Sequence, residues 1–201
     1  NNDAIVLATL DSMNHEKENY YYISEEQTDN SRFKTAETLI KQYPESTCTV
    51  EAYISICRLL ETDSKSKGLR LEYARKGAEK YAANPRSAVL RNIINTITCP
   101  ECRAYFGTST LPEGKAHNVR LEAVNASKIS IAFYRLPYAA SDAALYNYDI
   151  LKLRKKVQKP SFTVSKTLNR INDYDSITDS IEITPKQKGV YIAELTVDGR
   201  S

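Results

Sequence analysis

Apolar residues in the first half of the chain recur every three or four positions, which is the spacing of one face of an α-helix. Three stripes of this kind run through residues 31–43, 50–60 and 70–82. Ser31 can cap the first of these helices, and Pro44 would end it. The stripes that predict the three helices are Phe33, Ala36, Leu39, Ile40 and Tyr43; Val50, Tyr53, Ile54, Cys57 and Leu60; and Leu71, Ala74, Ala78 and Tyr81.

Two more helices are expected on either side of these three. One begins at Asn84 as its N-cap, with Pro85 in the first helical position. The other lies within residues 4–22, ahead of a charged stretch. Their apolar positions are Val89, Leu90, Ile93, Ile94 and Ile97 in the first case, and Ile5, Leu7 and Leu10 in the second.

Two of the expected helices end in similar sequences. The run that begins at Ala36 resembles the run that begins at Ala74, and the two are 38 residues apart (74 − 36). Helical-hairpin repeats have periods of about 34–47 residues. We therefore expect residues 1–105 to form a helical-hairpin bundle of tetratricopeptide-like type.

Beyond residues 111–114 the apolar positions alternate, which predicts β-strands. The turn-rich residues 125–128 join the first two strands as a hairpin. Short strands separated by turns favour an antiparallel β-sandwich of macroglobulin or immunoglobulin-like type over residues 106–201. Residues 139–157 are the exception and predict a helical insertion or a long connection. The strand positions are Val119, Leu121 and Ala123; Ile129, Ile131 and Phe133; Phe162 and Val164; Ile181 and Ile183; and Tyr191, Ala193, Leu195 and Val197.

Composition narrows the functional classes only a little. The chain has 201 residues, of which 41% are hydrophobic and 26% charged, and its formal net charge is +3. This small charge does not indicate a nucleic-acid partner, and no apolar run is long enough for a transmembrane helix. A start at Asn1 and an end at Ser201, directly after a strand, lead us to expect a segment of a longer protein.

Cys99 and Cys102 form the sharpest local motif, Cys-Pro-Glu-Cys. A redox pair needs its first cysteine at a helix N-terminus, whereas this pair follows a predicted helix. A zinc site needs two further ligands, and only Cys48, Cys57 and His117 are candidates. We therefore favour a structural pair, either oxidised to a disulfide or kept as thiols, with redox and zinc functions as the alternatives.

The other two cysteines are nine residues apart (57 − 48) on one predicted helical segment. Residues with that separation lie on different sides of a regular helix, so Cys48 and Cys57 are not expected to face each other. Cys57 belongs to an apolar stripe and is expected to be buried as a small hydrophobic residue. A bridge from Cys48 to the other pair stays open.

Other polar clusters offer weaker candidates for chemistry. His15 and His117 are isolated and suggest no catalytic triad. One acidic cluster is expected in a solvated turn before a strand; it consists of Asp173, Asp175, Asp179 and Glu182. The basic segment 152–159 is expected at a solvated helix end; its charged residues are Lys152, Arg154, Lys155, Lys156 and Lys159. Tyr20, Tyr21 and Tyr22 are interpreted either as a contact patch or as packing on the first helical hairpin. We expect no catalytic residues, no metal site and no cofactor.

Four short motifs of the second half resemble a known family. They are a Pro-x-Gly entry at residues 112–114, an Asn-x-x-Lys turn at 125–128, a Tyr-Arg-Leu strand end at 134–136 and a Gly-x-Tyr start at 189–191. Within the stretches 112–136 and 181–195 they resemble the N-terminal region of bacterial, Bacteroides-type alpha-2-macroglobulin proteins, where a helical segment precedes the first macroglobulin β-sandwich. The resemblance covers about residues 110–200 and, less closely, the helical half.

The resemblance implies a scaffold domain of an envelope-associated protease trap, periplasmic or attached to the outer membrane. The family's thioester motif and bait segment have no counterpart in these residues, so no family site residue is carried over. We expect a monomeric, non-catalytic structural or interaction segment. The full-length protein, of which it is a part, is expected to bind a protein partner or a protease. The alternatives are a peptide- or protein-binding adaptor that uses the helical repeats, with the sandwich as a spacer, and a redox protein centred on Cys99 and Cys102.

Overall fold

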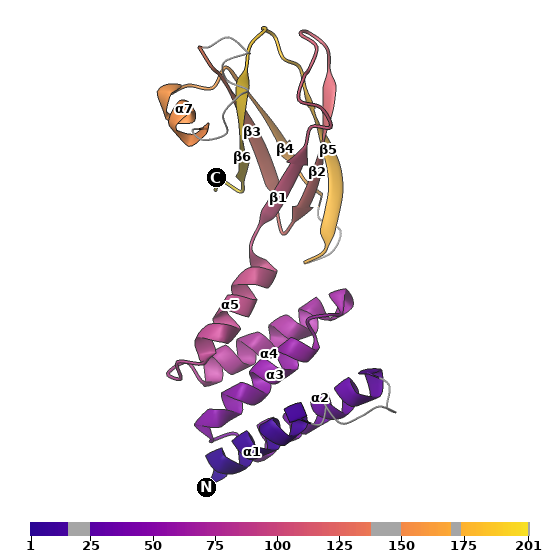
Figure 1. The fold of residues 1–201 in the computed structure, drawn as a ribbon, viewed down its shortest axis with the longest axis vertical. Helices are drawn as coiled ribbons and strands as arrows, with labels where there is room; N and C mark the ends of the chain where they lie inside the picture. Colours follow the sequence, from indigo (N-terminus) through magenta and orange to yellow (C-terminus); the bar gives the residue numbers. More distant parts are fainter. Residues whose placement is uncertain (16–24, 138–149, 170–173, 201) are drawn as a thin grey trace. The chain divides into compact units, whose positions relative to one another are not determined.

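The computed structural model describes residues 1–15, 25–137, 150–169 and 174–200 and divides the chain into two compact units. The first unit, Asn1–Thr98, is helical, and the second, Cys99–Ser201, consists mainly of antiparallel strands (Figure 1). An N-terminal helical region followed by antiparallel sheets is therefore confirmed. The division lies between residues 98 and 99, whereas the change of hydrophobic spacing predicted it between 105 and 106.

Five α-helices are described in the first unit: α1 (Asn2–His15), α2 (Glu25–Gln42), α3 (Val50–Leu59), α4 (Lys67–Lys80) and α5 (Ser87–Thr98). Each corresponds to a predicted helix. Ser31 is not an N-cap, because α2 begins six residues earlier (31 − 25) and residues 25–30 contain no glycine or proline to stop it. Helix α5 begins at Ser87, three residues after the expected N-cap, because the turn before it has i→i+3 hydrogen bonds from Ser87 N–H to Asn84 O and from Ala88 N–H to Pro85 O. The Asn84 side chain accepts a hydrogen bond from the Arg86 N–H at 2.9 Å, as an N-cap side chain does.

Consecutive helices pack against one another in chain order, from α1·α2 to α4·α5. Two apolar clusters fill the space between them, one around α1, α2 and α3 and the other around α3, α4 and α5. The turns after α2 and α4 stack directly: the Tyr81 hydroxyl donates to the Pro44 carbonyl at 2.9 Å, and the Asn84 amide donates to the Thr47 carbonyl at 2.9 Å. These bonds join the two places where the sequence repeats.

Six strands are described in the second unit, and they make up two antiparallel sheets. The first sheet has the order β1 (Glu101–Tyr105), β2 (His117–Val124), β5 (Ser176–Ile183), and the second has the order β4 (Phe162–Thr167), β3 (Lys128–Arg135), β6 (Tyr191–Val197). All the predicted alternating runs are strands. One shared core lies between the sheets, with Val119 and Leu121 of β2 and Ile129 and Ile131 of β3 almost fully buried.

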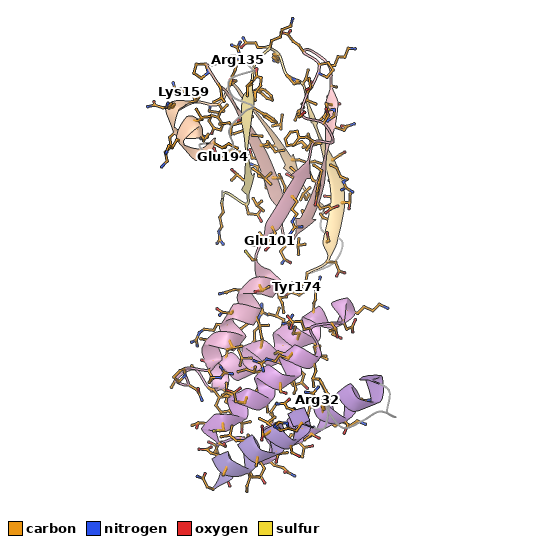
Figure 2. All side chains as sticks on the ribbon, in the orientation of Figure 1. Arg32, Glu101, Arg135, Lys159, Tyr174 and Glu194 are labelled. Carbon is orange, nitrogen blue, oxygen red and sulfur yellow. The ribbon has the colours of Figure 1, made fainter. Side chains whose placement is uncertain are left out.

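Strand β1 accounts for the shifted boundary. It begins at Glu101 (Figure 2) and pairs with β2 from Glu101↔Val124 to Tyr105↔Arg120. Its burial alternates, so Cys102 and Ala104 face the core. Residues 101–105 therefore belong to the sheet unit rather than to the helical one.

A short helix, α7 (Ile150–Lys156), follows the β3 strand. The sequence allowed a helical insertion or a long connection at residues 139–157, and the described part of that segment is helical. Arg154 extends from α7 over the Tyr134 ring, 3.3 Å from its centroid, and binds Glu194 of β6 at 2.7 Å. This contact attaches α7 to the outer face of the β4–β3–β6 sheet.

Candidate functional site

The structure separates the two cysteines of the Cys-Pro-Glu-Cys motif. Cys99 precedes β1 and is exposed, whereas Cys102 lies within β1 and packs against the sandwich core. Both are free thiols. Burial raises the pKa of the Cys102 thiol. Cys99 follows the C-terminal end of α5, so the helix N-terminus that would activate a redox cysteine is not placed at this motif.

The other cysteines lie in the helical unit and are also free thiols. Cys57 is fully buried in α3, as the apolar stripe predicted, and burial raises its pKa to about 11. Cys48 lies in a separate 3-10 turn (Thr47–Thr49) rather than on the same helix, because Ser46 and the residues after it form a turn before α3 begins. Burial is also the main cause of the raised pKa of Cys48.

The histidines and carboxylates are not assembled into one site. The His117 ring nitrogen is hydrogen-bonded to the Phe106 carbonyl at 2.7 Å, and His15 lies 3.5 Å from Asp11 on α1. In the part of the chain that the structure describes, no three His, Cys, Asp or Glu side chains form a group able to hold a metal ion. Of the acidic cluster, Asp173 lies outside the described residues, as do Tyr20, Tyr21 and Tyr22.

Asp179 is not the solvated turn residue that the sequence suggested. It lies on β5 and binds the Lys166 ammonium of β4 at 2.5 Å, so the pair links the two sheets along one side of the sandwich. The hydrogen bond from Lys166 holds the pKa of Asp179 below its usual value. Asp175 and Glu182 are exposed, in agreement with a solvated position.

The basic segment 152–159 has a mixed role. Arg154 is an internal ion-pair partner of Glu194, and its hydrogen bond lowers the pKa of that carboxyl group. Lys155, Lys156 and Lys159 are exposed, and Lys159 lies just beyond the end of α7 (Figure 2). The prediction of a solvated helix end therefore holds for these lysines and is wrong for Arg154.

The most developed candidate site is an apolar groove at one end of the sandwich. Its volume is about 690 Å³, within the range of about 300–1,000 Å³ found for ligand sites. Aromatic side chains form its apolar lining, and the loops that follow β1 and β5 complete it. The aromatic residues are Phe106, Phe133, Phe162 and Tyr191, with Leu111, Pro185, Val190 and Ala193 beside them.

The aromatic rings of the groove form a connected set. Phe133 stacks on Phe162 with 4.5 Å between the centroids, and Phe106 and Tyr191 meet these two rings edge to face at 6.2 Å and 6.0 Å. The Tyr191 hydroxyl donates to the Gln187 carbonyl at 2.8 Å and holds the β5–β6 loop beside the groove. Phe133, Phe162 and Tyr191 lie on paired strands whose register holds their rings together, and Phe106 directly follows β1, so the groove is formed without a bound ligand.

Comparison with known proteins gives no relative for this chain. No family model matches it, no curated protein matches it, and no solved structure matches it. Within the described residues, every helix is too short or too polar to cross a membrane. The groove and its surroundings are therefore the basis on which function can be argued.

Proposed function

We propose that the chain is a non-catalytic interaction and structural segment of a larger alpha-2-macroglobulin-like envelope protein, and that its sandwich binds a protein segment in the apolar groove. The preformed aromatic groove is the observation that carries this proposal. An apolar pocket with few charged groups suits the burial of hydrophobic side chains. Charge contributes little, since Glu113 and Lys188 are the charged residues of the lining.

The macroglobulin-like type is part of the proposal and is supported by strand order. Six described strands form two antiparallel sheets of three, and their inner faces share one core. The motifs that carry the family resemblance lie at structurally defined places. Asn125 takes a positive φ of 55° in the β2–β3 turn, and Gly189, with φ 153°, precedes β6.

The tetratricopeptide-like type is supported by the repeated stacking of the helical unit. Helices α1 and α2 are followed by α3 and α4, and the run that begins at Ala74 in α4 resembles the run that begins at Ala36 in α2, 38 residues earlier (74 − 36). The hydrogen bonds from Tyr81 to Pro44 and from Asn84 to Thr47 join equivalent turns. Such units bury their apolar faces on their neighbours.

A helical adaptor is the second candidate. A hollow of about 330 Å³ lies between α1 and α2 and has a mixed lining, in which Thr9, Thr35 and Thr38 lie beside Ile5 and Leu39. Ile5 lines this hollow and is 45% exposed, because the buried face of α1 consists of Val6, Leu10 and Met13 and not of the predicted Ile5 and Leu7. A partner that covers this face would make the helices the binding element and the sandwich a spacer.

Site-specific photo-crosslinking of the whole chain separates the two candidates. A photoreactive phenylalanine is placed at Thr110, which lines the groove, or at Lys34, which lines the α1–α2 hollow. After irradiation in an envelope extract, we expect one recurrent protein segment linked to the Thr110 variant and only background at Lys34. Recurrent adducts confined to Lys34 would establish the adaptor function instead, and the absence of adducts at both positions would refute binding by either unit.

A further inference from the structure

Positive charge is concentrated in one stretch of the chain. Residues 150–172 contain seven lysine or arginine residues and no aspartate or glutamate, so the stretch carries a formal charge of +7. The whole chain carries only +3, which leaves −4 (3 − 7) for all the other residues. The small net charge therefore conceals one strongly basic stretch. Its basic residues are Lys152, Arg154, Lys155, Lys156, Lys159, Lys166 and Arg170.

Two of these charges are neutralised inside the sandwich unit. Arg154 binds Glu194 at 2.7 Å, and Lys166 binds Asp179 at 2.5 Å. Three other lysines of the stretch are exposed, and in the described part of the chain no carboxylate forms an ion pair with them. These three, which we call the lysine cluster, are Lys155, Lys156 and Lys159.

Arg154 determines which side of α7 faces the sheet. Its guanidinium group lies 3.3 Å from the centroid of the Tyr134 ring on β3. Successive residues of an α-helix are rotated by about 100°, so Lys155 and Lys156 lie about 100° and 200° around the helix from Arg154. Lys159 follows the end of α7 and is exposed as well (Figure 2). The lysine cluster therefore projects into the solvent from the outer side of the sandwich.

The sheet face beneath α7 does not offset this charge. Among the described outward residues of β3, β4 and β6, Glu194 is the one acidic side chain, and Arg154 already binds it. Most of the other outward residues carry a hydroxyl group. The outward set is Lys128, Ser130, Ala132 and Tyr134 on β3; Thr163, Ser165 and Thr167 on β4; and Ile192, Glu194 and Thr196 on β6.

The chemistry of the lysine cluster favours a surface of many anions over one shaped ligand. The lysine ammonium group is a strongly hydrated point charge, whereas the planar fork of arginine binds a single phosphate or carboxylate in bidentate fashion. The arginine of α7, Arg154, is already bound to Glu194 and to the Val157 carbonyl. The lysine cluster also lines none of the hollows described above, so no pocket fixes the shape of a ligand there.

Nucleic acids and protein segments fit this surface less well. Single-stranded nucleic acids need aromatic rings on which their bases stack, and Arg154 covers the ring of Tyr134, the aromatic residue of this face. Protein interfaces are depleted of lysine and rely on aromatic or arginine anchors in pockets. An anionic membrane requires neither, because each lysine near its surface contributes to the attraction separately.

We propose that the lysine cluster docks the sandwich on an anionic lipid surface, with α7 between the sheet and the headgroups. This inference goes beyond the proposed function and does not depend on ligand binding in the groove. Each lysine strengthens such binding about fivefold, which corresponds to about 1 kcal/mol. The three together supply about a hundredfold, and the attraction weakens as salt screens the charges.

Co-sedimentation of the whole chain with lipid vesicles tests the proposal. One set of vesicles consists of phosphatidylcholine alone, and the other contains about 30% phosphatidylglycerol, which is anionic. At about 0.05 M NaCl the chain should bind the anionic vesicles and leave the phosphatidylcholine vesicles unbound. At about 0.5 M NaCl the anionic vesicles should release it.

Matched variants locate the binding on the protein. Substitution of glutamine for all three members of the lysine cluster should weaken binding to the anionic vesicles about a hundredfold. The same substitution at Lys34, Lys41 and Lys65, which are exposed on the helical unit, removes an equal charge and should change binding less than about twofold. Substitution of arginine for the lysine cluster keeps the charge and should preserve binding within about threefold.

Three results would overturn the inference: no binding to the anionic vesicles, equal binding to both kinds of vesicle, or equal weakening in the two glutamine variants when circular dichroism shows both folded. Saturable binding of a fluorescent hexaglutamate peptide without vesicle binding would assign a protein partner to the lysine cluster instead. Inorganic phosphate that releases the vesicles more effectively than NaCl of equal ionic strength would indicate a phosphate site and would also overturn the inference. Binding in the groove is tested separately by the cross-links at Thr110.

Discussion

Replacing Gly77 by alanine probes how closely the helices of the first unit approach one another. Gly77 is buried in α4, and a Cβ atom there would lie 2.7 Å from Cδ1 of Leu90 in α5 and 2.7 Å from Cγ of Tyr53 in α3. Both distances are below 3.0 Å, and the Cβ of Tyr53, at 2.8 Å, cannot move without a shift of α3. The helices must therefore separate to accept a single methyl group.

Two effects of opposite sign determine the size of the change. Alanine is favoured over glycine in a helix by about 0.5–1 kcal/mol, whereas overpacking a filled core costs about 1–3 kcal/mol. The contacts involve Tyr53 atoms close to the main chain, so the cost should lie near the upper end and leave a net loss of about 1–2 kcal/mol. For a unit of this size, that loss lowers the melting temperature by roughly 5–15 °C.

Gly68 supplies the matched control in the same helix. No atom lies within 4 Å of a Cβ built there, and its φ is not in the left-handed region. Gly68→Ala should raise the melting temperature of the helical unit by a few degrees, followed by circular dichroism at 222 nm. A Gly77→Ala variant that is stabilised as much as Gly68→Ala would refute the close helix approach described here.

Three other predictions concern the sandwich and the cysteines. Asp198→Ala removes the carboxylate that accepts hydrogen bonds from two amides of the β2–β3 turn and leaves an alanine at a φ of 47°. Urea denaturation should show a free energy of unfolding that is lower by about 1.5–3 kcal/mol. Asp198→Asn should lower it by less. The hydrogen bond from Lys166 lowers the pKa of Asp179, so the contribution of Asp179 to stability is present above the unfolded-state pKa of about 3.9 and is lost as the pH falls through the lower folded-state value. Because the pair is about one-third exposed, Asp179→Asn should cost at most about 1 kcal/mol at pH 7 and less at pH 2. An equal loss of stability at both pH values would contradict this. Iodoacetamide at pH 8 should alkylate the exposed Cys99 first, as followed by peptide mass spectrometry. Buried Cys57, whose pKa is raised to about 11, should be alkylated only after denaturation. Rapid labelling of Cys57 in the native protein would contradict its burial.

Local spacing was sufficient to predict most elements of the fold. The stripe of α5 and the alternation of β2 and β3 are long, and each places its apolar residues on one face. Strand β1 gave no such signal, since its two inward residues, Cys102 and Ala104, are small. Residues 101–105 form a strand because their backbone pairs with β2, about 20 residues further along the chain. A local spacing pattern cannot indicate a partner at that distance.

The groove could not be predicted from local sequence. Phe106, Phe133, Phe162 and Tyr191 belong to four separate segments, and only the pairing of β3 with β4 and β6 brings their rings together. The Asp-Gly pair at residues 198–199 is a recognisable hairpin signal, and the structure has a tight turn there. Arg154 was misassigned for a similar reason, because its partners come from other strands.

Photo-crosslinking of the intact chain with its groove filled tests the binding claim most directly. Ala193 lines the groove beside Phe133 and Phe162 and is exposed, so Ala193→Phe would place another ring in the groove. The adducts that recur at Thr110 should be lost in this variant when circular dichroism shows that it is folded. Adducts that persist at Thr110 with the groove filled would contradict binding in the groove.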